Sequence, residues 1–474
     1  MKGFLPTAGN KAWFIAPTLV GAALPLLTLP LITRTIDPTD YGYWVLAYSF
    51  AAFVSGVGNF GLSIAYERNF YEFTDTRTNA ALLWTTVSFV VLLLGLFVTT
   101  TWLLRDSLSV LVMRAPAHAE LLAWTVTAVA VGSIKTYFLL HLRNNGNARA
   151  FAFFNIDESL TGAIATVVLV VFLKVGVLGL AWGPLIASSL VLGLLVLRFV
   201  RRVPIVWQSA PLVASLRLSL PLLPRILLGV VGTQFDKWIV GYVGTSAGAA
   251  VYAIGQRLAN SVFLLATALE NAFQPRTYRL MFDGGPAAGA QIGRMLTPYV
   301  YLIVAFAVAM ALFAEEAIFL LADRSYRGGA IVADILVLHF ALMFFGKQPQ
   351  LTFARRSDLN SLIGILSLVL TGTITAVFAV HWLAVGAAVG TLLAGALSTG
   401  IFQAVSQRYY RIEYEWRTLL GLYGYLAVCC VLAVFRPWQG VSLGLVLVIK
   451  SALLAALLYA GWRRGWLRRD GLGA

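Results

Sequence analysis

The sequence predicts an all-α membrane protein that crosses the bilayer many times. Its 474 residues are 59 % hydrophobic and only 12 % charged, whereas a typical soluble chain is about 25 % charged. At about 20 apolar residues per helix, the chain can supply a dozen or more membrane spans. The mean hydropathy of +0.83 leaves no room for a soluble domain of ordinary size. This composition excludes a soluble enzyme with one anchor, a fibrous protein and a disordered chain. It also excludes a barrel porin, because the strands of a porin alternate polar and apolar residues.

Fourteen apolar segments stand out when hydropathy is averaged over about 19 residues. In chain order the predicted spans are residues 12–33, 41–66, 80–104, 119–142, 151–174, 177–199, 218–243, 247–271, 295–322, 329–346, 359–380, 382–404, 417–435 and 440–462. The first segment contains Pro17, Pro25 and Pro30 and is too long for a signal peptide, so we interpret it as a membrane helix. Short loops divide the pairs within residues 151–199 and 359–404. An even number of spans places both termini on one side of the membrane.

Lysine and arginine residues indicate the orientation of these spans. The chain holds 35 Lys and Arg against 20 Asp and Glu, a net charge of +15. Segments on the side of the termini carry about three times as many cations as segments on the opposite side, which places both termini in the cytoplasm. We therefore interpret the basic surplus as a topology signal. It predicts contacts with membrane lipids and no nucleic-acid partner.

Residues that carry enzymatic chemistry are sparse in this sequence. The segments between spans are short, so binding must take place within the bilayer or at its faces. No GxxxxGK[ST] loop occurs, which argues against ATP hydrolysis by this chain. The four histidines are scattered, and Cys429 and Cys430 are adjacent in an apolar run. We therefore expect no metal site, no cofactor and no disulfide framework.

Two sequence similarities indicate an internal duplication. Leu-Pro-Leu-Leu at residues 24–27 recurs at residues 220–223, in the first and seventh spans. The Gly-x3-Gly of residues 179–183, in the sixth span, recurs at residues 386–390, in the twelfth. Both offsets are close to six spans, and an even number of spans per repeat makes the two copies parallel.

The duplication predicts three parts of the chain. Residues 1–205 form an N-lobe of six spans, residues 206–405 a C-lobe of six spans, and residues 406–474 an extension of two helices. Two lobes related by an axis along the membrane normal leave a cleft between them. Alternating access by rocking of the lobes is the motion that this arrangement favours.

The junction of the first two spans carries a motif. Residues 30–42 follow the pattern P-x3-R-x-(L/I)-x-P-x2-Y-G. The second half contains Ser219-Leu-Pro221, Asp236-Lys237, Gly248 and Tyr252-Ala253. Together these residues resemble the polysaccharide lipid flippases, the Wzx-like branch of the MOP exporter superfamily, which also holds MATE drug exporters and lipid II flippases. The resemblance extends over both predicted lobes, and the two further spans fit the fourteen-helix members.

This resemblance implies a transporter and not an enzyme. Such a protein moves an undecaprenyl-diphosphate-linked oligosaccharide from the cytoplasmic to the periplasmic leaflet of the bacterial inner membrane, through a cationic cavity. The implied partners are the lipid-linked oligosaccharide, membrane lipids and other polysaccharide-assembly proteins. Lipid II itself fits poorly, because the first span has no Arg in its interior, where lipid II flippases keep basic residues.

Cations inside the spans are the first candidates for substrate binding, because a diphosphate cannot cross hydrocarbon unaided. They are Lys135, Arg225, Lys237, Arg257 and Lys450. Arg225 is the leading candidate, since Gly229, Gly232 and Asp236 fall within about 40° of it on a helix and leave one small, charged face. The alternative is that a carboxylate or carbonyl of another span pairs with Arg225.

A polar row on the eighth span supplies further candidates. The row consists of Gln256, Asn260, Thr267 and Asn271, which lie within about 40° of Asn260 on a helix. We expect it to line water, with Gln256 and Asn260 contacting substrate. Arg257, beside the row, and Lys135 are candidates for phosphate contact; the alternatives are an interhelical pair for Arg257 and snorkelling for Lys135. For Lys450, a structural partner is favoured.

Acids inside the spans are candidates for ion coupling, because desolvated carboxyl groups can carry protons. Asp236 is the first choice, followed by Asp157 and Glu270. Structural pairing is the alternative for each of them. Glu315 and Glu316 are expected at the membrane interface.

Three other functions stay open at this level. A MATE-like ion-coupled exporter of small molecules should hold acids without a surplus of buried cations. A membrane-embedded polysaccharide-assembly enzyme, such as a polymerase, generally needs a large outer loop. A scaffold without transport activity is the third.

Overall fold

The computed structural model of this chain describes residues 8–73, 75–437 and 440–466. Within these residues the regular structure is helical and no strand is present. Eleven of the described helical segments are long and apolar enough to cross a membrane. The prediction of an all-α polytopic membrane protein is therefore confirmed. Each of the fourteen predicted spans overlaps one or more described helices.

Two compact units make up the chain. The first comprises Met1–Ala250 with Leu321–Asp323, and the second comprises Val251–Leu320 with Arg324–Ala474. The division falls inside helix α11 (Ser246–Gly284). The lobe boundaries expected from the duplication stay a prediction.

The first unit is a helical bundle that begins at the N-terminus. Its helices are α1 (Ala8–Thr33), α2 (Pro38–Asn59), α3 (Leu62–Glu72), α4 (Thr76–Leu103), α5 (Arg105–Met113), α6 (Ala119–Asn144), α7 (Ala148–Val167), α8 (Gly179–Val200), α9 (Ser209–Ser219) and α10 (Leu223–Val243). The second predicted span is divided between α2 and α3, because Phe60 and Gly61 adopt left-handed backbone conformations there. A π-helical segment, Val168–Phe172, continues α7 to the end of the fifth predicted span.

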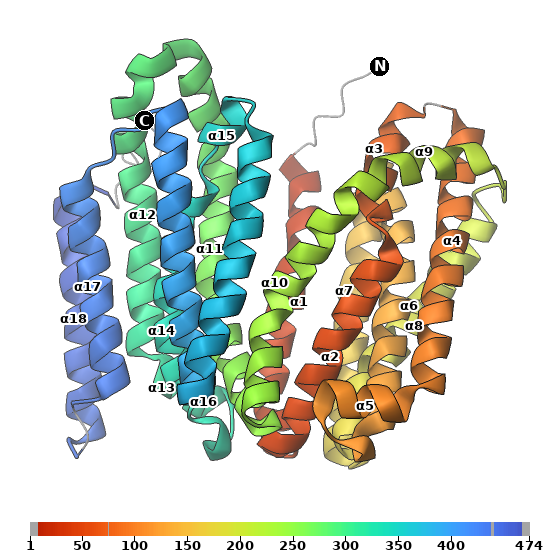
Figure 1. Ribbon diagram of the computed structural model, residues 1–474, viewed down its shortest axis with the longest axis horizontal. Helices are drawn as coiled ribbons and strands as arrows, with labels where there is room; N and C mark the ends of the chain where they lie inside the picture. Colours follow the sequence, from red (N-terminus) through yellow and green to blue (C-terminus); the bar gives the residue numbers. More distant parts are fainter. Residues whose placement is uncertain (1–7, 74, 438–439, 467–474) are drawn as a thin grey trace. The chain divides into compact units, whose positions relative to one another are not determined.

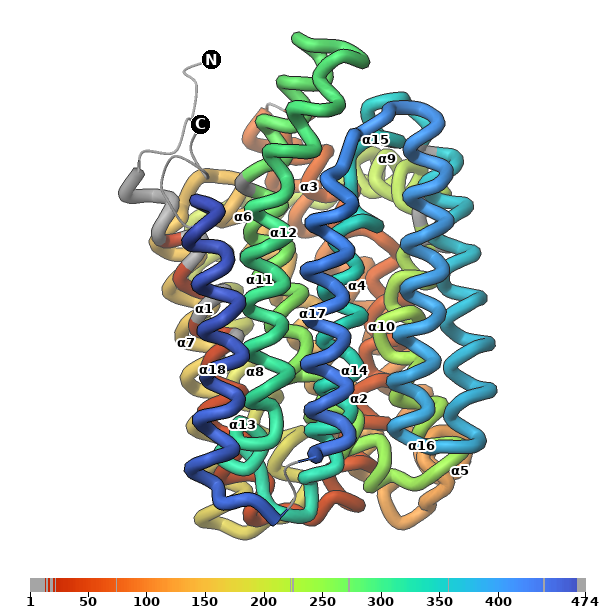
Figure 2. Tube along the Cα trace, turned by 90° about the vertical axis from the view of Figure 1, so that its left-hand side faces the viewer, coloured from red at the N-terminus to blue at the C-terminus, as the bar shows by residue number. Residues whose placement is uncertain are grey.

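The second unit contains the remaining helices (Figure 1). They are the rest of α11, then α12 (Gly289–Leu312), α13 (Ala314–Leu321), α14 (Gly329–Leu342), α15 (Gln350–Phe353), α16 (Ser357–Tyr409), α17 (Trp416–Phe435) and α18 (Leu443–Arg463). Helix α16 includes two predicted spans, separated by non-helical backbone at Trp382 and Leu383. Helices α17 and α18 run beside α12 (Figures 1 and 2), and α12 is buried along most of its length.

Side-chain caps fix where two helices begin. The Asp37 carboxylate accepts hydrogen bonds from the amides of Thr39 at 2.7 Å and Asp40 at 3.0 Å, and Pro38 occupies the first turn of α2, where its missing donor costs nothing. Asp75 accepts from the amide of Thr78 at 2.9 Å to cap α4. These hydrogen bonds from Thr78 lower the pKa of Asp75, because they stabilise its charged form.

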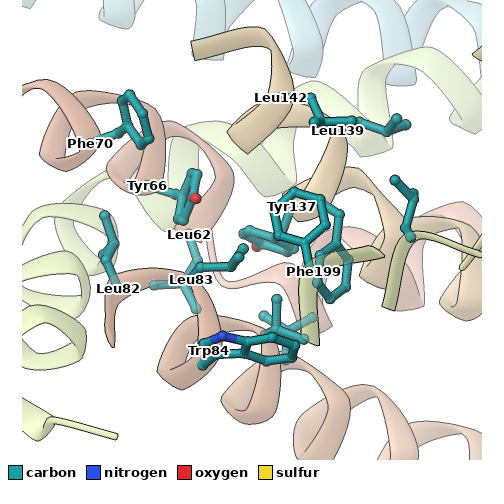
Figure 3. Close-up of a cluster of buried hydrophobic side chains, with 14 of the residues drawn as sticks. Leu62, Tyr66, Phe70, Leu82, Leu83, Trp84, Tyr137, Leu139, Leu142 and Phe199 are labelled. Carbon is teal, nitrogen blue, oxygen red and sulfur yellow. The ribbon is translucent and has the colours of Figure 1, made fainter. Parts of the chain in front are cut away.

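Aromatic and aliphatic side chains together form a buried cluster in the first unit (Figure 3). Tyr66 of α3 packs edge-on against Tyr137 of α6, with ring centroids 5.8 Å apart. Phe138 lies between Trp84 of α4 and Phe199 of α8. Edge-to-face ring contacts therefore join helices that are far apart in the sequence. Such contacts stabilise the fold by more than the burial of apolar surface alone.

Glycines allow two pairs of consecutive spans to approach closely. In the first unit, Gly183 of α8 lies against the backbone of Thr166 on α7. In the second unit, Gly390 in the second half of α16 lies against the backbone of Thr375 in its first half. Lipid tails are as apolar as leucine, so membrane helices gain by close backbone packing at small residues. Gly183 and Gly390 are the glycines that the Gly-x3-Gly similarity relates to each other.

Candidate functional site

A polar pocket of about 710 Å³ opens between α1, α3, α6 and α7 of the first unit. It is lined by Pro17, Gly21, Glu67, Tyr71, Arg143, Asn144, Phe151, Asn155, Glu158 and Ser159. Besides Tyr71 with its hydroxyl group, six of these residues have polar or charged side chains. The helices around the pocket are otherwise apolar. Polar residues at such a place are costly unless they pair or bind something.

Ion pairs neutralise the charges around this pocket. Arg143 at the end of α6 pairs with Glu67 of α3, with Nη2 and Oε1 2.6 Å apart. Deeper in the bundle, Lys135 of α6 pairs with Glu158 of α7, and the Ser188 hydroxyl donates to Glu158 at 2.8 Å. Two cations and two carboxylates thus balance each other. The pocket is a neutral polar site and lacks the excess of positive charge that a diphosphate requires.

Several groups in the pocket suit a ligand with many hydroxyls. The Asn144 amide nitrogen is buried and has no hydrogen-bond partner among the described residues, which is unusual for a buried polar atom. Asn155 donates from its amide nitrogen to the carbonyl of Phe151 at 2.7 Å, and its amide oxygen is available to accept a further hydrogen bond. The Tyr71 side chain is 65 % exposed. Planar amides, carboxylates and an open aromatic face can together bind a sugar ring through hydrogen bonds and stacking.

Lys135 lies inside the fourth predicted span, on α6, but its surroundings differ from those of a phosphate-binding lysine. Its side chain is only 7 % exposed and its ammonium group is held by Glu158. The carboxylate satisfies the charge, so Lys135 has no need to snorkel to the interface. The acid that pairs with Lys135 is Glu158, whereas the adjacent Asp157, a predicted ion-coupling residue, is half-buried.

The remaining predicted residues of the first unit lie on α10. The side chain of Arg225 falls outside the described residues, so its partners are not assigned. Asp236 is buried, and its Oδ1 lies 3.7 Å from Nζ of the adjacent Lys237. Lys237 also donates to the carbonyl of Thr233 at 2.9 Å.

The predicted residues of the second unit lie along α11. Gln256 and Asn260 are half-buried and Arg257 is exposed. Glu270 lies 3.7 Å from Nζ of Lys347, the residue directly after the tenth predicted span. Lys347 also donates to Thr267 of the polar row at 3.0 Å. The polar row is therefore tied, at one point, to a neighbouring helical segment.

Two expectations for the extension meet different outcomes. Lys450 was expected to have a structural partner, and this is confirmed, because it pairs with Glu316 at 2.6 Å. Glu315 and Glu316 also belong to ion pairs, Glu315 with Arg436 at 3.0 Å, and their position at the membrane interface stays a prediction. The first turn of α13 thus contacts the two cations of the extension.

Sequence reasoning did not single out the pocket residues Glu67, Tyr71, Arg143 and Asn144. Arg143 served only as a topology marker. The sequence does contain a signal for these residues. Glu67 and Tyr71 are four residues apart and therefore share one face of α3, and the predicted topology places this helix on the same side of the membrane as the end of α6. Within the described residues, no group of three His, Cys, Asp or Glu side chains is arranged to hold a metal ion.

Solved structures show which fold these helices form. The lipid II flippase MurJ in an inward closed conformation matches with a TM-score of 0.73 at 12 % identity, over 95 % of this chain and 99 % of that one. An inward-facing multidrug resistance MATE family transporter of the MOP superfamily matches with a TM-score of 0.63 at 17 % identity, over 84 % and 97 %. A Vibrio cholerae MATE transporter, VcmN, matches with a TM-score of 0.54 at 17 % identity, over 88 % and 98 %. The chain therefore has the fold of these transporters.

Sequence comparison identifies the family. No curated protein matches the chain. The family model described as "Polysaccharide biosynthesis protein" matches residues 31–328, which is more than half of the chain. This span includes the motif of residues 30–42 almost completely and the opening of the second half. The chain therefore belongs to the polysaccharide biosynthesis protein family of membrane proteins.

Proposed function

We propose that this protein is a flippase that moves a lipid-linked oligosaccharide across the bacterial cytoplasmic membrane by alternating access. The observation that carries the proposal is the neutral polar pocket of the first unit, inside the membrane helices of a protein from a polysaccharide biosynthesis family. The MOP-type fold supports transport and not catalysis. The proposed substrate is an undecaprenyl-diphosphate-linked oligosaccharide, and other polysaccharide-assembly proteins are proposed partners.

The pocket is proposed to bind the sugar part of this substrate. Two carboxylates, Glu67 and Glu158, line it. Each is already paired with a cation, so the pocket offers a diphosphate no excess positive charge, whereas sugar hydroxyls can donate hydrogen bonds to the carboxylate oxygens. The diphosphate is assigned instead to Arg225, Arg257 and the polar row with Gln256 and Asn260. Sugar and phosphate groups of one substrate would then be recognised by different side chains.

Replacing Asn144 by alanine tests the sugar-binding role. Because the Asn144 amide nitrogen has no partner among the described residues, we expect thermal stability equal to or above that of the wild type. Loss of one hydrogen bond to the sugar costs about 1 kcal/mol, or roughly fivefold in transport. The measurement is translocation of the lipid-linked oligosaccharide in proteoliposomes, at equal protein abundance.

Asn145→Ala provides the matched control for that experiment. Asn145 is the next residue along the chain and its side chain is exposed. It should transport at the wild-type rate. Unchanged transport by Asn144→Ala would refute the assignment of the pocket to the sugar, and export of small cations without oligosaccharide would favour the MATE-like alternative.

Arg225 is proposed to contact the diphosphate. Arg225→Ala should lower transport about tenfold, because a charge-assisted contact of roughly 1.5 kcal/mol is lost. Arg225→Lys should recover part of the activity, since lysine keeps the charge but lacks the bidentate fork. Arg468→Ala, a substitution in the C-terminal tail, serves as control. Normal transport by Arg225→Ala would remove this residue from the substrate site.

The two-lobe organisation, with parts 1–205, 206–405 and 406–474, is proposed to underlie the transport motion. Equivalent contacts inside each half support it. Tyr66 donates to or accepts from His141 at 2.7 Å between the second and fourth spans, and Glu270 contacts Lys347 between the eighth and tenth. The members of each pair are separated by nearly the same length of chain. Both termini are proposed to lie in the cytoplasm, and Asp236, Asp157 and Glu270 are kept as proposed ion-coupling residues.

A further inference from the structure

Five charged residues gather in the second unit where the C-terminal helices meet α13 and α14. They are Glu315, Glu316, Asp334, Arg436 and Lys450. Arg436 donates to Glu315 at 3.0 Å and Lys450 to Glu316 at 2.6 Å. Lys450 lies well inside α18 and its side chain is 2 % exposed. These contacts join the two-helix extension to the rest of the second unit.

Asp334 is the fifth member and differs from the other four. Its residue is 2 % exposed, and its Oδ1 is buried without a hydrogen-bond partner in the part of the chain that the structure describes. Among the described residues, none forms an ion pair with Asp334, although the charges of all four other members of the cluster act on its carboxyl group. The side chain therefore lies within the cluster but is bound by none of its cations.

The neighbours of Asp334 come from three helical segments. Helix α13 contributes Glu315 and Glu316, α18 contributes Lys450, and the end of α17 contributes Arg436. The thiol of Cys430 on α17 also interacts with Asp334. Helices α12 and α16 pack on α14 as well, but none of their described charged groups is among those that act on Asp334.

Charge counting shows what this cluster lacks. Three carboxyl groups share two cations, and both cations already pair with Glu315 and Glu316. A buried carboxylate without a partner is very costly, because it has lost its hydration and gained no compensating charge. One more positive charge would balance the cluster. No described group of three His, Cys, Asp or Glu side chains is arranged to hold a metal ion, so the cation that fits is a proton.

We propose that Asp334 is a proton-binding site that controls how the extension formed by α17 and α18 is held against α13 and α14. One carboxylate oxygen of Asp334 takes up a proton and the side chain becomes a neutral acid. With the proton bound, each cation keeps a single carboxylate partner. When the proton leaves, the buried carboxylate has neither water nor a cation of its own. Separation of α17 and α18 from α14 lets water reach Asp334, so ionisation weakens the attachment of the extension. The site exists independently of the substrate that the protein moves.

Infrared spectroscopy of the purified full-length protein in lipid tests this site directly. A protonated carboxyl group has a C=O stretching band that ionised carboxylates lack. At pH 7 the wild type should show such a band, with the expected small shift in D₂O, and Asp334→Asn should lose it. Asp283→Asn, which removes an exposed carboxylate of α11, is the matched control and should keep the band.

Each contrary result has a definite meaning. Identical spectra of the wild type and Asp334→Asn would overturn the proposal, as would loss of the band in Glu316→Gln with retention in Asp334→Asn. Asparagine has the shape of the neutral acid, so failure of Asp334→Asn to fold at pH 7 would show that the cluster needs the ionised carboxylate. A band that vanishes when sodium chloride replaces choline chloride would assign the site to Na⁺ instead. Normal spectra combined with absent oligosaccharide transport would count against the proposed function and leave the proton site intact.

Discussion

Replacing Lys135 by methionine is expected to remove most of the folded protein from the membrane. The Lys135 side chain is 7 % exposed and that of its partner Glu158 is 23 % exposed. The substitution leaves a carboxylate largely buried without its cation, which costs about 3–5 kcal/mol. That is a large fraction of the total stability of an ordinary domain, about 5–15 kcal/mol. The measurement is membrane abundance together with the thermal unfolding temperature in detergent.

A double variant separates pairing from substrate contact. Lys135→Met combined with Glu158→Gln removes both charges and should recover most of the lost stability, since no buried charge then lacks a partner. Lys174→Met alters an exposed lysine at the very end of the fifth predicted span and should behave like the wild type. Stable, abundant Lys135→Met protein that fails to transport would instead support a direct contact between Lys135 and the substrate.

Valine at Gly183 or Gly390 is expected to destabilise the protein by about 3 kcal/mol, the upper end for overpacking. A side chain at Gly183 would overlap the backbone of Thr166, and one at Gly390 would overlap that of Thr375 and Ile374. Backbone atoms cannot move aside as a flexible side chain can, so the two helices must separate. Close packing at small residues is a main source of helix association in membranes. Thermal unfolding of each purified variant measures the effect.

Matched controls exist on the same two helices. Gly193 of α8 and Gly400 of α16 have no heavy atom within 4 Å of an added Cβ. Gly193→Val and Gly400→Val should therefore leave stability unchanged or raise it slightly, because valine is a somewhat better helix former than glycine. Equal losses for Gly183→Val and Gly193→Val would show that the contact with Thr166 does not set the result.

The candidate site could be predicted only in part. Lys135 and the acids beside it were recognisable because charged residues are rare in apolar segments. Which acid pairs with Lys135 was not, since Asp157 and Glu158 are adjacent and point about 100° apart on a helix. The pocket residues Glu67 and Arg143 were missed because each lies at the end of an apolar segment, where charges are common and carry no special signal.

The sequence by itself determined the membrane location, the helical class, the positions of the spans and the family motif at residues 30–42. These properties follow from hydropathy and local patterns, because each helix must satisfy its own backbone groups in lipid wherever it lies. Only the tertiary structure decided which charges meet, as with Lys135 and Glu158, Lys450 and Glu316, or Asp334 without a partner. Such pairs join different helices, and the rotation and depth of each helix are set by its packing against neighbours, which a linear pattern does not encode.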